Sequence, residues 1–303
     1  EDIERLLTEQ QLSAVSVLAT QVNRELETRT EALKTVAGIS ASALLEGSPS
    51  LQAFLEQTPY LQSFFNGGVF AIDADGVALA AVPMAAERIG VNYMDRDYAI
   101  AALREGRASI SRPVTGRTLH APVFVMATPI HDPQGKVIGA LAVVVNLGAP
   151  NFLDQITQNH YGKTGDYQVV APQYRLIVAT SDKKRIMEVL PPPGVIPLID
   201  HFIANHEGSG VVVNPHGIEV LASAKPIPVA GWYALVLLPT AEAFAPIRDM
   251  QGHMRLAALL LTLLAGWLTW RVLKSQLSPL VDAANVLAGM SDALEKGENV
   301  KIS

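Results

Sequence analysis

The feature that most constrains the fold is a helical pattern that runs without a proline from Asp2 to Glu46. Apolar residues recur there at three- and four-residue steps, which is the period of one helix face, and Gly47 and Pro49 supply a stop signal. A helix of this length reaches on the order of 65 Å. Because a single small domain is not that wide, we expect the helix to lie along two domains or to pair with a partner helix.

After a second, shorter helix predicted over residues 50–65, the pattern changes to short apolar runs with the period of strands. Val69–Ala74 and Val77–Val82, joined by Asp75-Gly76, predict a hairpin. A short helix over residues 97–105 and strands over residues 109–113, 123–131 and 136–147 complete the plan. Five strands with one inserted helix indicate an α+β module with an antiparallel sheet.

The same plan returns about a hundred residues further along the chain. A hairpin is predicted over residues 167–180, followed by strands over residues 210–213, 219–227 and 232–239. The fragments Ala127-Thr128-Pro129-Ile130 and Ala224-Lys225-Pro226-Ile227 lie 97 positions apart, and the two hairpins begin 98 positions apart. This agreement predicts an internal duplication, with a linker helix over residues 151–158 between its halves.

A run of fifteen uncharged residues lies between Arg255 and Arg271. Fifteen helical residues rise about 22 Å, which is less than the roughly 30 Å of a bilayer core. Both arginines can snorkel, however, so we interpret residues 254–273 as a membrane span with Trp267 and Trp270 at one interface. A buried helix of a soluble domain is the alternative.

The segment after the run, residues 275–303, is expected to form a helix that Pro279 opens. Its apolar and small residues follow four- and three-residue steps, either as a short heptad seam or as an ordinary amphipathic helix: Leu280, Ala284, Leu287, Ser291 and Leu294.

Several function classes are excluded by composition and by the absence of motifs. A net charge of −6 argues against a nucleic-acid partner, and the chain has no cysteine for disulfides, zinc ribbons or thiol catalysis. We find no nucleophile elbow, phosphate-binding loop or dinucleotide fingerprint. His201 and His206, beside Asp200 and Glu207, come nearest to a metal cluster, but a five-residue helical spacing directs the two imidazoles to different faces. We therefore expect no enzyme, cofactor or metal site.

The densest group of polar residues is the run Tyr93-Met94-Asp95-Arg96-Asp97-Tyr98, which leads into the predicted helix at 97–105. Asp97 could simply cap that helix. The guanidinium of Arg96 could hold a carboxylate through two parallel hydrogen bonds, and the phenol of Tyr98 could add a third.

Other polar residues come from the strand and loop that would face this helix. They are Ser111 and Arg112, followed by Arg117 and His120, for which a solvated loop is the expected setting. The matching stretch of the second module, residues 181–189, offers no comparable group, and we expect Lys183, Lys184 and Arg185 to form a solvated face.

These residues resemble the double Cache (dCache) sensor domains over residues 1 to about 250. The motifs that carry the resemblance are Asp95-Arg96-Asp97-Tyr98, Ile110-Ser111-Arg112-Pro113, Ala127-Thr128-Pro129-Ile130, Gly135-Lys136-Val137-Ile138-Gly139, Gly162-Lys163-Thr164-Gly165-Asp166-Tyr167, Ala179-Thr180-Ser181-Asp182 and Ala230-Gly231-Trp232. The resemblance implies a long N-terminal helix beside two stacked PAS-like modules, a small ligand in the membrane-distal module, and a homodimer that passes the signal across a bacterial inner membrane.

The resemblance also implies a division of the chain, which we take as a long helix over 1–48, a distal ligand-binding module over 49–150, a proximal module over 151–250, a transmembrane helix over 251–274, and a HAMP-like or linker helix over 275–303. Two basic residues precede the run and two follow it, so charge does not orient the span. On the resemblance, residues 1–250 are periplasmic or extracellular and residues 275–303 are cytoplasmic.

A ligand chemistry follows from the same resemblance. In amino-acid-binding members, an R-x-W-Y motif clamps the ligand carboxylate and an aspartate on the last strand clamps the ammonium. Arg96 matches the arginine, Tyr98 stands at the tryptophan, Ala99 replaces the tyrosine, and the aspartate position falls at Val144. A valine cannot pair with an ammonium. We therefore expect a carboxylate without an α-ammonium, or another small anion, bound by Tyr93, Asp95, Arg96, Tyr98, Ser111, Arg112 and Val144.

The output of the receptor is implied only by residues 239–247. This run resembles the exit segment of dCache proteins that carry PAS, GGDEF and EAL domains, which places a cyclic-di-GMP cyclase or phosphodiesterase after Ser303. A chemoreceptor or a histidine kinase stays open as the output. A membrane-tethered module that binds a periplasmic protein is a further alternative.

Overall fold

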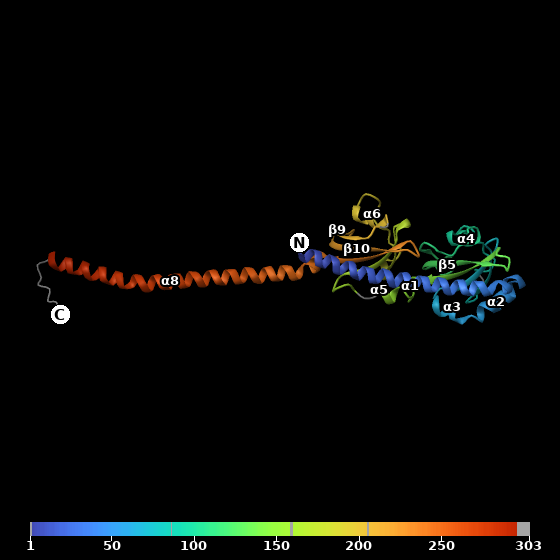
Figure 1. The fold of residues 1–303 in the computed structure, drawn as a ribbon, viewed down its shortest axis with the longest axis horizontal. Coiled ribbons are helices and arrows are strands. Elements are labelled where there is room, and N and C mark those ends of the chain that lie inside the picture. The colour runs from blue at the N-terminus through green and yellow to red at the C-terminus, as the bar shows by residue number, and fades with distance from the viewer. Residues whose placement is uncertain (1, 86, 158–159, 205, 296–303) are drawn as a thin grey trace. The chain divides into compact units, whose positions relative to one another are not determined.

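The computed structural model describes residues 2–85, 87–157, 160–204 and 206–295, with only the backbone described for residues 2–4, 62, 246–253, 255, 275–284, 288, 290 and 292–295. The chain divides into two compact units, residues 1–243 and residues 244–303, and each is considered by itself. The first unit contains two antiparallel sheets and the helices that cover them (Figure 1).

The predicted long helix is confirmed as α1, Asp2–Glu46. It ends at Gly47, whose φ of 113° is a conformation that residues with a Cβ rarely adopt. The shorter helix predicted over residues 50–65 is instead two helices, α2 (Ser48–Glu56) and α3 (Pro59–Phe64). The break falls before Pro59, which has no backbone N–H to continue a helix and is suited to begin a new one.

The two sheets have the same strand order, which confirms the predicted duplication and the α+β fold class. The first sheet runs β2-β1-β6-β5-β3, with β4 also paired to β5, and the second runs β8-β7-β11-β10-β9. The helix α4 (Asp97–Leu103) follows the first hairpin, as α6 (Pro197–Ile203) follows the second. The strands are β1 Val69–Asp73, β2 Ala78–Val82, β3 Ser109–Ile110, β4 Val114–Thr115, β5 Pro122–His131, β6 Val137–Asn146, β7 Asp166–Ala171, β8 Leu176–Thr180, β9 Gly208–Val213, β10 Glu219–Ile227 and β11 Trp232–Pro239.

Both faces of the first sheet are buried, which explains why its central strands are apolar almost throughout. Successive side chains of a strand point to opposite faces. On β6, Leu141 and Val143 belong to the core shared with α1, whereas Ala142 and Val144 belong to the core beneath α4. The face on which each residue lies therefore follows from its parity along the strand.

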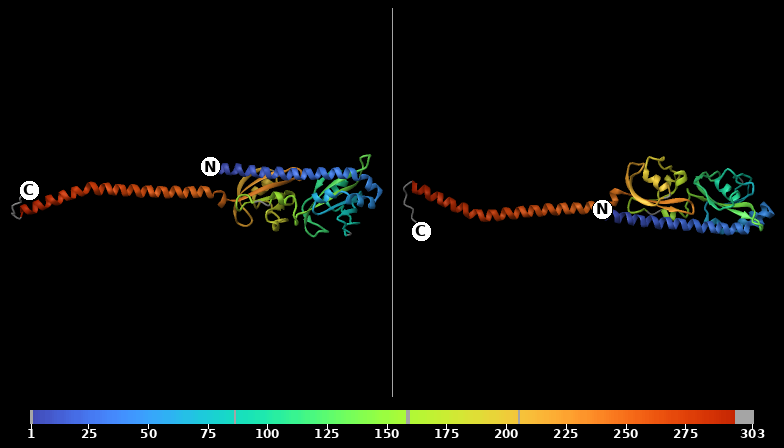
Figure 2. Two further views of the ribbon diagram at one scale, coloured as in Figure 1. Left: turned by 90° about the horizontal axis from the view of Figure 1, so that it is seen from below. Right: turned by 45° about the horizontal axis from the view of Figure 1, so that its top comes forward.

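One face of α1 packs against both sheets, and α4 and α6 lie on the opposite side (Figures 1 and 2). Leu26 is fully buried midway along α1. The buried Gln11 amide donates hydrogen bonds of 2.9 Å to the carbonyls of Leu221 on β10 and Val236 on β11, which ties the helix to the second sheet. Directly between the modules, the rings of Phe124 and Trp232 meet edge to face at 5.2 Å.

Lys183 and Lys184 are exposed, as expected of a solvated face, and Lys183 pairs there with Asp154 at 2.6 Å. Arg185 departs from that expectation, because it is partly buried and pairs with Glu188 at 2.7 Å. The expectation for the two histidines is wrong. The rings of His201 and His206 do not diverge but stack at 4.6 Å, since α6 ends at Ile203 and the helical spacing does not apply across its end. No group of metal-ligating side chains is found among the described residues.

The second unit contains the helix α8, Ala245–Glu295. Within it, Leu256–Lys274 is long and apolar enough to cross a membrane, with a mean hydropathy of 1.8 and none of the segment buried. The hydroxyls of Thr262 and Thr269 donate to carbonyls four residues earlier at 2.8 Å, so they need no other partner. The guanidinium of Arg271 lies 5.4 Å from the Trp267 ring.

The expectation that Pro279 opens a separate helix is wrong, because α8 continues through it. Some side chains needed for the predicted snorkelling and heptad seam lie outside the described part of the chain. They are those of Arg255, Leu280, Ala284 and Leu294.

The shared core predicts the effect of two matched substitutions on α1. Leu26→Ala removes a fully buried side chain and should lower the free energy of unfolding by about 2–5 kcal/mol. Leu45→Ala deletes the same atoms from the same helix at a side chain that is 63% exposed, and should change it by less than about 1 kcal/mol. Urea denaturation of the full chain measures both; similar losses for the two variants would contradict the packing of α1 described above.

Candidate functional site

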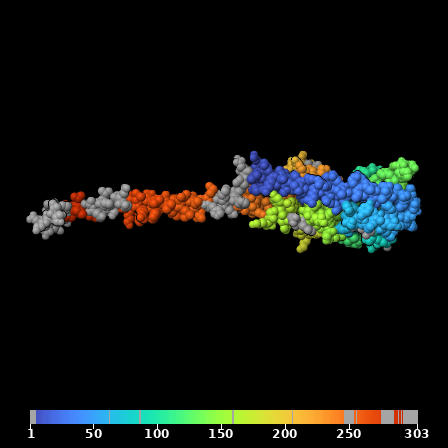
Figure 3. All heavy atoms as spheres, turned by 60° about the horizontal axis from the view of Figure 1, so that its bottom comes forward, coloured from blue at the N-terminus to red at the C-terminus, as the bar shows by residue number. Residues whose placement is uncertain are grey.

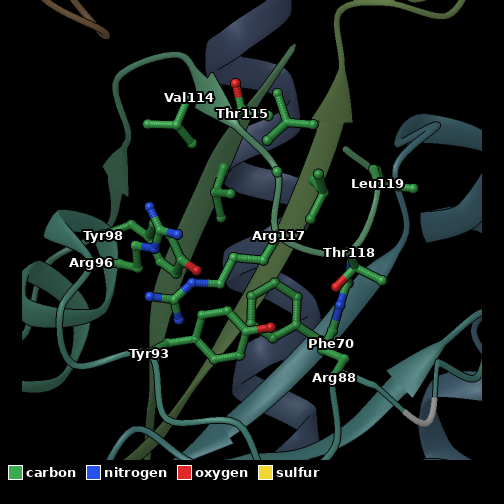
Figure 4. A pocket seen from close by; sticks show the side chains of 14 residues that line it. Phe70, Arg88, Tyr93, Arg96, Tyr98, Val114, Thr115, Arg117, Thr118 and Leu119 are labelled. Carbon is green, nitrogen blue, oxygen red and sulfur yellow. The ribbon is translucent and has the colours of Figure 1, made fainter. Parts of the chain in front are cut away.

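A cavity lies in the first module, between the outer face of the first sheet, the loop that leads into α4, and the loop between β4 and β5 (Figure 4). The cavity has a volume of about 40 Å³, counted as the space that the centre of a water molecule can occupy. Four of the candidate residues line it, namely Tyr93, Arg96, Tyr98 and Val144. The rest of its wall comes from Phe70, Arg88, Val114, Thr115, Gly116, Arg117, Thr118, Leu119, Val123 and Val125.

The loop that carries Arg88, Tyr93 and Arg96 is held to the first hairpin by backbone hydrogen bonds. The N–H of Gly90 donates to the carbonyl of Ala78, and the N–H of Tyr93 donates to the carbonyl of Gly76, both at 2.8 Å. At the start of α4, the Asp97 carboxylate accepts from the N–H of Tyr98 at 2.8 Å, so it binds the free backbone of the first turn. The side chains of this loop are thereby fixed over the sheet.

The aromatic wall of the cavity consists of Phe70, Tyr93 and Tyr98. The Phe70 ring lies 5.0 Å from that of Tyr93 and 6.4 Å from that of Tyr98. Burial raises the pKa of both tyrosine hydroxyls, although the charges of Arg88 and Arg96 oppose the rise. Both phenols therefore remain protonated near neutral pH and can donate hydrogen bonds to an acceptor in the cavity.

Three guanidiniums line the cavity. Arg117 pairs with Asp95 at 2.5 Å, and the same carboxylate oxygen lies 3.7 Å from Arg96. Asp95 does not line the cavity itself; it neutralises part of the positive charge beside it. Arg88 is only 6% exposed and stacks on Phe70 at 4.8 Å. No aspartate or glutamate is among the described residues that line the cavity.

Val144 lies on the cavity face of β6, where it continues an apolar wall with Val123 and Val125 of β5. Its backbone exchanges hydrogen bonds with the chain just before β1: the N–H of Gly67 donates to the carbonyl of Val144 at 2.9 Å, and the N–H of Val144 donates to the carbonyl of Gly68 at 2.8 Å. A Cβ on Gly67 would approach that carbonyl to 2.6 Å, so the close contact requires glycine. The strand is held firmly at this position.

Two candidate residues lie elsewhere. The buried Ser111 hydroxyl donates to the carbonyl of Arg112 and accepts from the N–H of Val125, both at 2.9 Å, so it fastens the chain after β3 to β5. The guanidinium of Arg112 lies 5.0 Å from the ring of Tyr174, which belongs to the second module. Neither lines the cavity.

The sequence had assigned Arg117 to a solvated loop and had not singled out Arg88, yet both line the cavity. No local motif marks Arg88. The exposed His120 remains directed to its own loop, with Nδ1 3.2 Å from the carbonyl of Thr118.

The corresponding space of the second module is filled by its own side chains. Phe202 of α6 packs there with Leu190 and with Tyr233 of β11. Arg175 pairs with Asp200 at 2.8 Å, and the N–H of Gly194 together with this guanidinium lowers the pKa of the Asp200 carboxyl. In the second module, therefore, the guanidinium of Arg175 has the carboxylate of Asp200 as its partner.

Comparison with known structures gives the same fold. The ligand-binding domain of the Pseudomonas aeruginosa PAO1 amino acid chemoreceptor PctB with L-Arg is 22% identical, covering 79% of this chain and 97% of that one, with a TM-score of 0.63. That of the Pseudomonas fluorescens chemoreceptor CtaA with L-isoleucine is 18% identical, covering 80% and 97%, with a TM-score of 0.62. That of the P. aeruginosa PAO1 chemoreceptor PctC with GABA is 17% identical, covering 76% and 99%, with a TM-score of 0.57.

Comparison with curated protein sequences found no match. The family model dCache_1, described as a Cache domain, matches residues 1–247, which include α1, both sheets and the cavity. Together with the two-sheet architecture along one long helix, this match shows that the chain belongs to the dCache family of ligand-binding sensor domains.

Proposed function

We propose that this chain is the sensory region of a transmembrane receptor, which binds a small carboxylate or another small anion in the cavity of the first module. The observation that carries the proposal is the charge of the cavity wall: Arg88, Arg96 and Arg117 line it, and the described lining contains no acidic side chain. Arginine presents a planar donor fork that suits carboxylates. The protonated hydroxyls of Tyr93 and Tyr98 add donors for the same group.

The wall also favours an anion over an α-amino acid. The similar structures hold L-Arg, L-isoleucine and GABA, each of which carries a cationic nitrogen as well as a carboxylate. An ammonium buried without a partner is costly. In this chain the residue of β6 that faces the cavity is Val144, and the carboxylate of Asp95, beside the cavity, is already engaged by Arg117. A ligand without an ammonium avoids that cost.

We further propose that ligand binding shifts the balance between two arrangements of a homodimer joined through α1 and a membrane-spanning part of α8. A ligand can shift such a balance only by its differential affinity for the two states. Support comes from the outward side of α1, which runs uncovered along the first unit and exposes Val17, Ile39 and Leu45 (Figure 3). The apolar, unburied segment Leu256–Lys274 supports the membrane part.

For the output we propose a cyclic-di-GMP cyclase or phosphodiesterase, reached through a HAMP-like helix, on the sequence resemblance of residues 239–247 and of Pro279-Leu280. A chemoreceptor or histidine kinase output is the alternative. A module that binds a periplasmic protein is less well supported, because it leaves the three arginines of the cavity without a role.

The proposal predicts that Arg96→Ala weakens binding of the anion by about 10- to 100-fold, since a bidentate, charge-assisted pair is lost. Ligand-induced thermal stabilisation of the full chain in detergent micelles should disappear, while the unliganded melting temperature stays nearly unchanged. Arg104→Ala is the matched control, because Arg104 is an exposed arginine at the end of the same helix. A large fall in the unliganded melting temperature would instead identify Arg96 as structural.

A second prediction concerns the sign of charge that the cavity accepts. Val144→Asp places a carboxylate in the cavity and should abolish binding of carboxylic acids, while allowing binding of α-amino acids. Val144→Asn, which has the same size and polarity without the charge, should keep the preference for acids. Calorimetry with a set of acids and the corresponding amino acids measures both variants. If the aspartate and asparagine variants behave alike, charge at this position does not select the ligand.

A further inference from the structure

Arg88 is the one residue of the cavity wall whose surroundings do not account for its charge. Only 6% of its surface is exposed. Among the residues that the structure describes, none forms a hydrogen bond or an ion pair with its side chain. Its guanidinium rests on the Phe70 ring at 4.8 Å. The residue lines the cavity, so an anion bound there can reach the guanidinium. A mostly buried cation without an anionic partner is unfavourable, so the arrangement points to an anion supplied from outside the chain.

The other two guanidiniums are in a different position. Arg117 and Arg96 share the carboxylate of Asp95, at 2.5 and 3.7 Å. In Figure 4, Arg88 and Thr118 lie at one end of the cavity and Arg96 and Tyr98 lie at the other, with Phe70, Tyr93 and the Arg117 side chain between them. The positive charge of the wall is thus divided between two separate ends.

The division of charge decides which kind of anion fits. A ligand with one carboxylate can engage Arg96 and the tyrosines, and would leave Arg88 buried and unpaired. A ligand with a second carboxylate at its far end pairs both. With three guanidiniums and one neighbouring carboxylate, the site has two positive charges in excess, which a dianion neutralises.

The geometry points to a small dicarboxylate as the ligand, with one carboxylate held by Arg96 and the other by Arg88. This inference rests on the proposed function, because it takes the cavity to be the anion-binding site, and it adds the number of anionic groups and the residue that recognises the second one. Arg88 is therefore a specificity-determining residue, whereas Arg96 is required for any carboxylate.

The fixed backbone around Arg88 makes this recognition rigid. The loop turns back on itself through a hydrogen bond of 3.2 Å from the N–H of Val91 to the carbonyl of Arg88, and Gly90 adopts a φ of 82° within it. The ring of Phe70 supports the guanidinium from below. Since little conformational freedom remains to be lost on binding, the site should discriminate ligands by the presence and reach of the second carboxylate.

The test compares acids of equal length on the full chain in detergent micelles, by calorimetry: succinate against butyrate, and glutarate against valerate. In at least one of the two pairs, we expect the dicarboxylate to bind about tenfold or more tightly than the monocarboxylate, because it engages a second charge-assisted site. In Arg88→Gln this ratio should fall to about threefold or less. Arg96→Gln should weaken all four acids, and Arg104→Gln should leave the ratio as it is.

The outcomes separate this inference from the proposed function. Equal binding of dicarboxylates and monocarboxylates by the wild type would overturn the dicarboxylate assignment and leave the anion-binding proposal standing. No binding of any of the four acids would count against both. If Arg88→Gln lowers the melting temperature of the unliganded protein markedly, while Arg88→Lys restores it without restoring the ratio, the stacked cation is structural and the inference is wrong. The expected result is an unliganded melting temperature no lower than that of the wild type.

Discussion

The burial of one face of α1 against both sheets is the contact on which the rest of the first unit depends. Each sheet is apolar on both faces, so neither could stand in water with one face uncovered. The helix covers one face of both sheets at once and joins them into a shared core, which the hydrogen bonds of Gln11 and the contact of Phe124 with Trp232 extend. The opposite faces are left to shorter elements, and there the two modules differ.

The difference between the modules is one of filling and of charge. Beneath α6, Phe202 and Leu190 occupy the space over the sheet, and the guanidinium of Arg175 has Asp200 as its partner. In the first module, a cavity lies between the sheet and the loop that leads into α4. Arg88 lines it and has no carboxylate partner among the described residues. The duplicated fold thus has one module whose space over the sheet is filled by side chains and one module with a cavity lined by three arginines.

The cavity, the loops around it and α1 are connected through the first sheet. In the proposed function, a ligand that neutralises both ends of the cavity would contact the loop after β2, α4 and the loop before β5 at the same time. These elements pack on a sheet whose other face is held by α1. A change in their positions would reach that helix through the packed sheet, which is the route that the proposed shift between two dimer arrangements requires.

The sequence by itself determined the long helix α1, the short helix α4, most strands, the duplication and the apolar segment Leu256–Lys274, because each follows from periodicity and turn residues within a short stretch. It also placed Tyr93, Arg96, Tyr98 and Val144 among the candidates. Only the tertiary structure decided that Arg88 and Arg117 line the same cavity, that Ser111 and Arg112 lie outside it, and that His201 and His206 stack. Such contacts depend on strand register and on the paths of loops far apart in the sequence, and local periodicity carries no information about either.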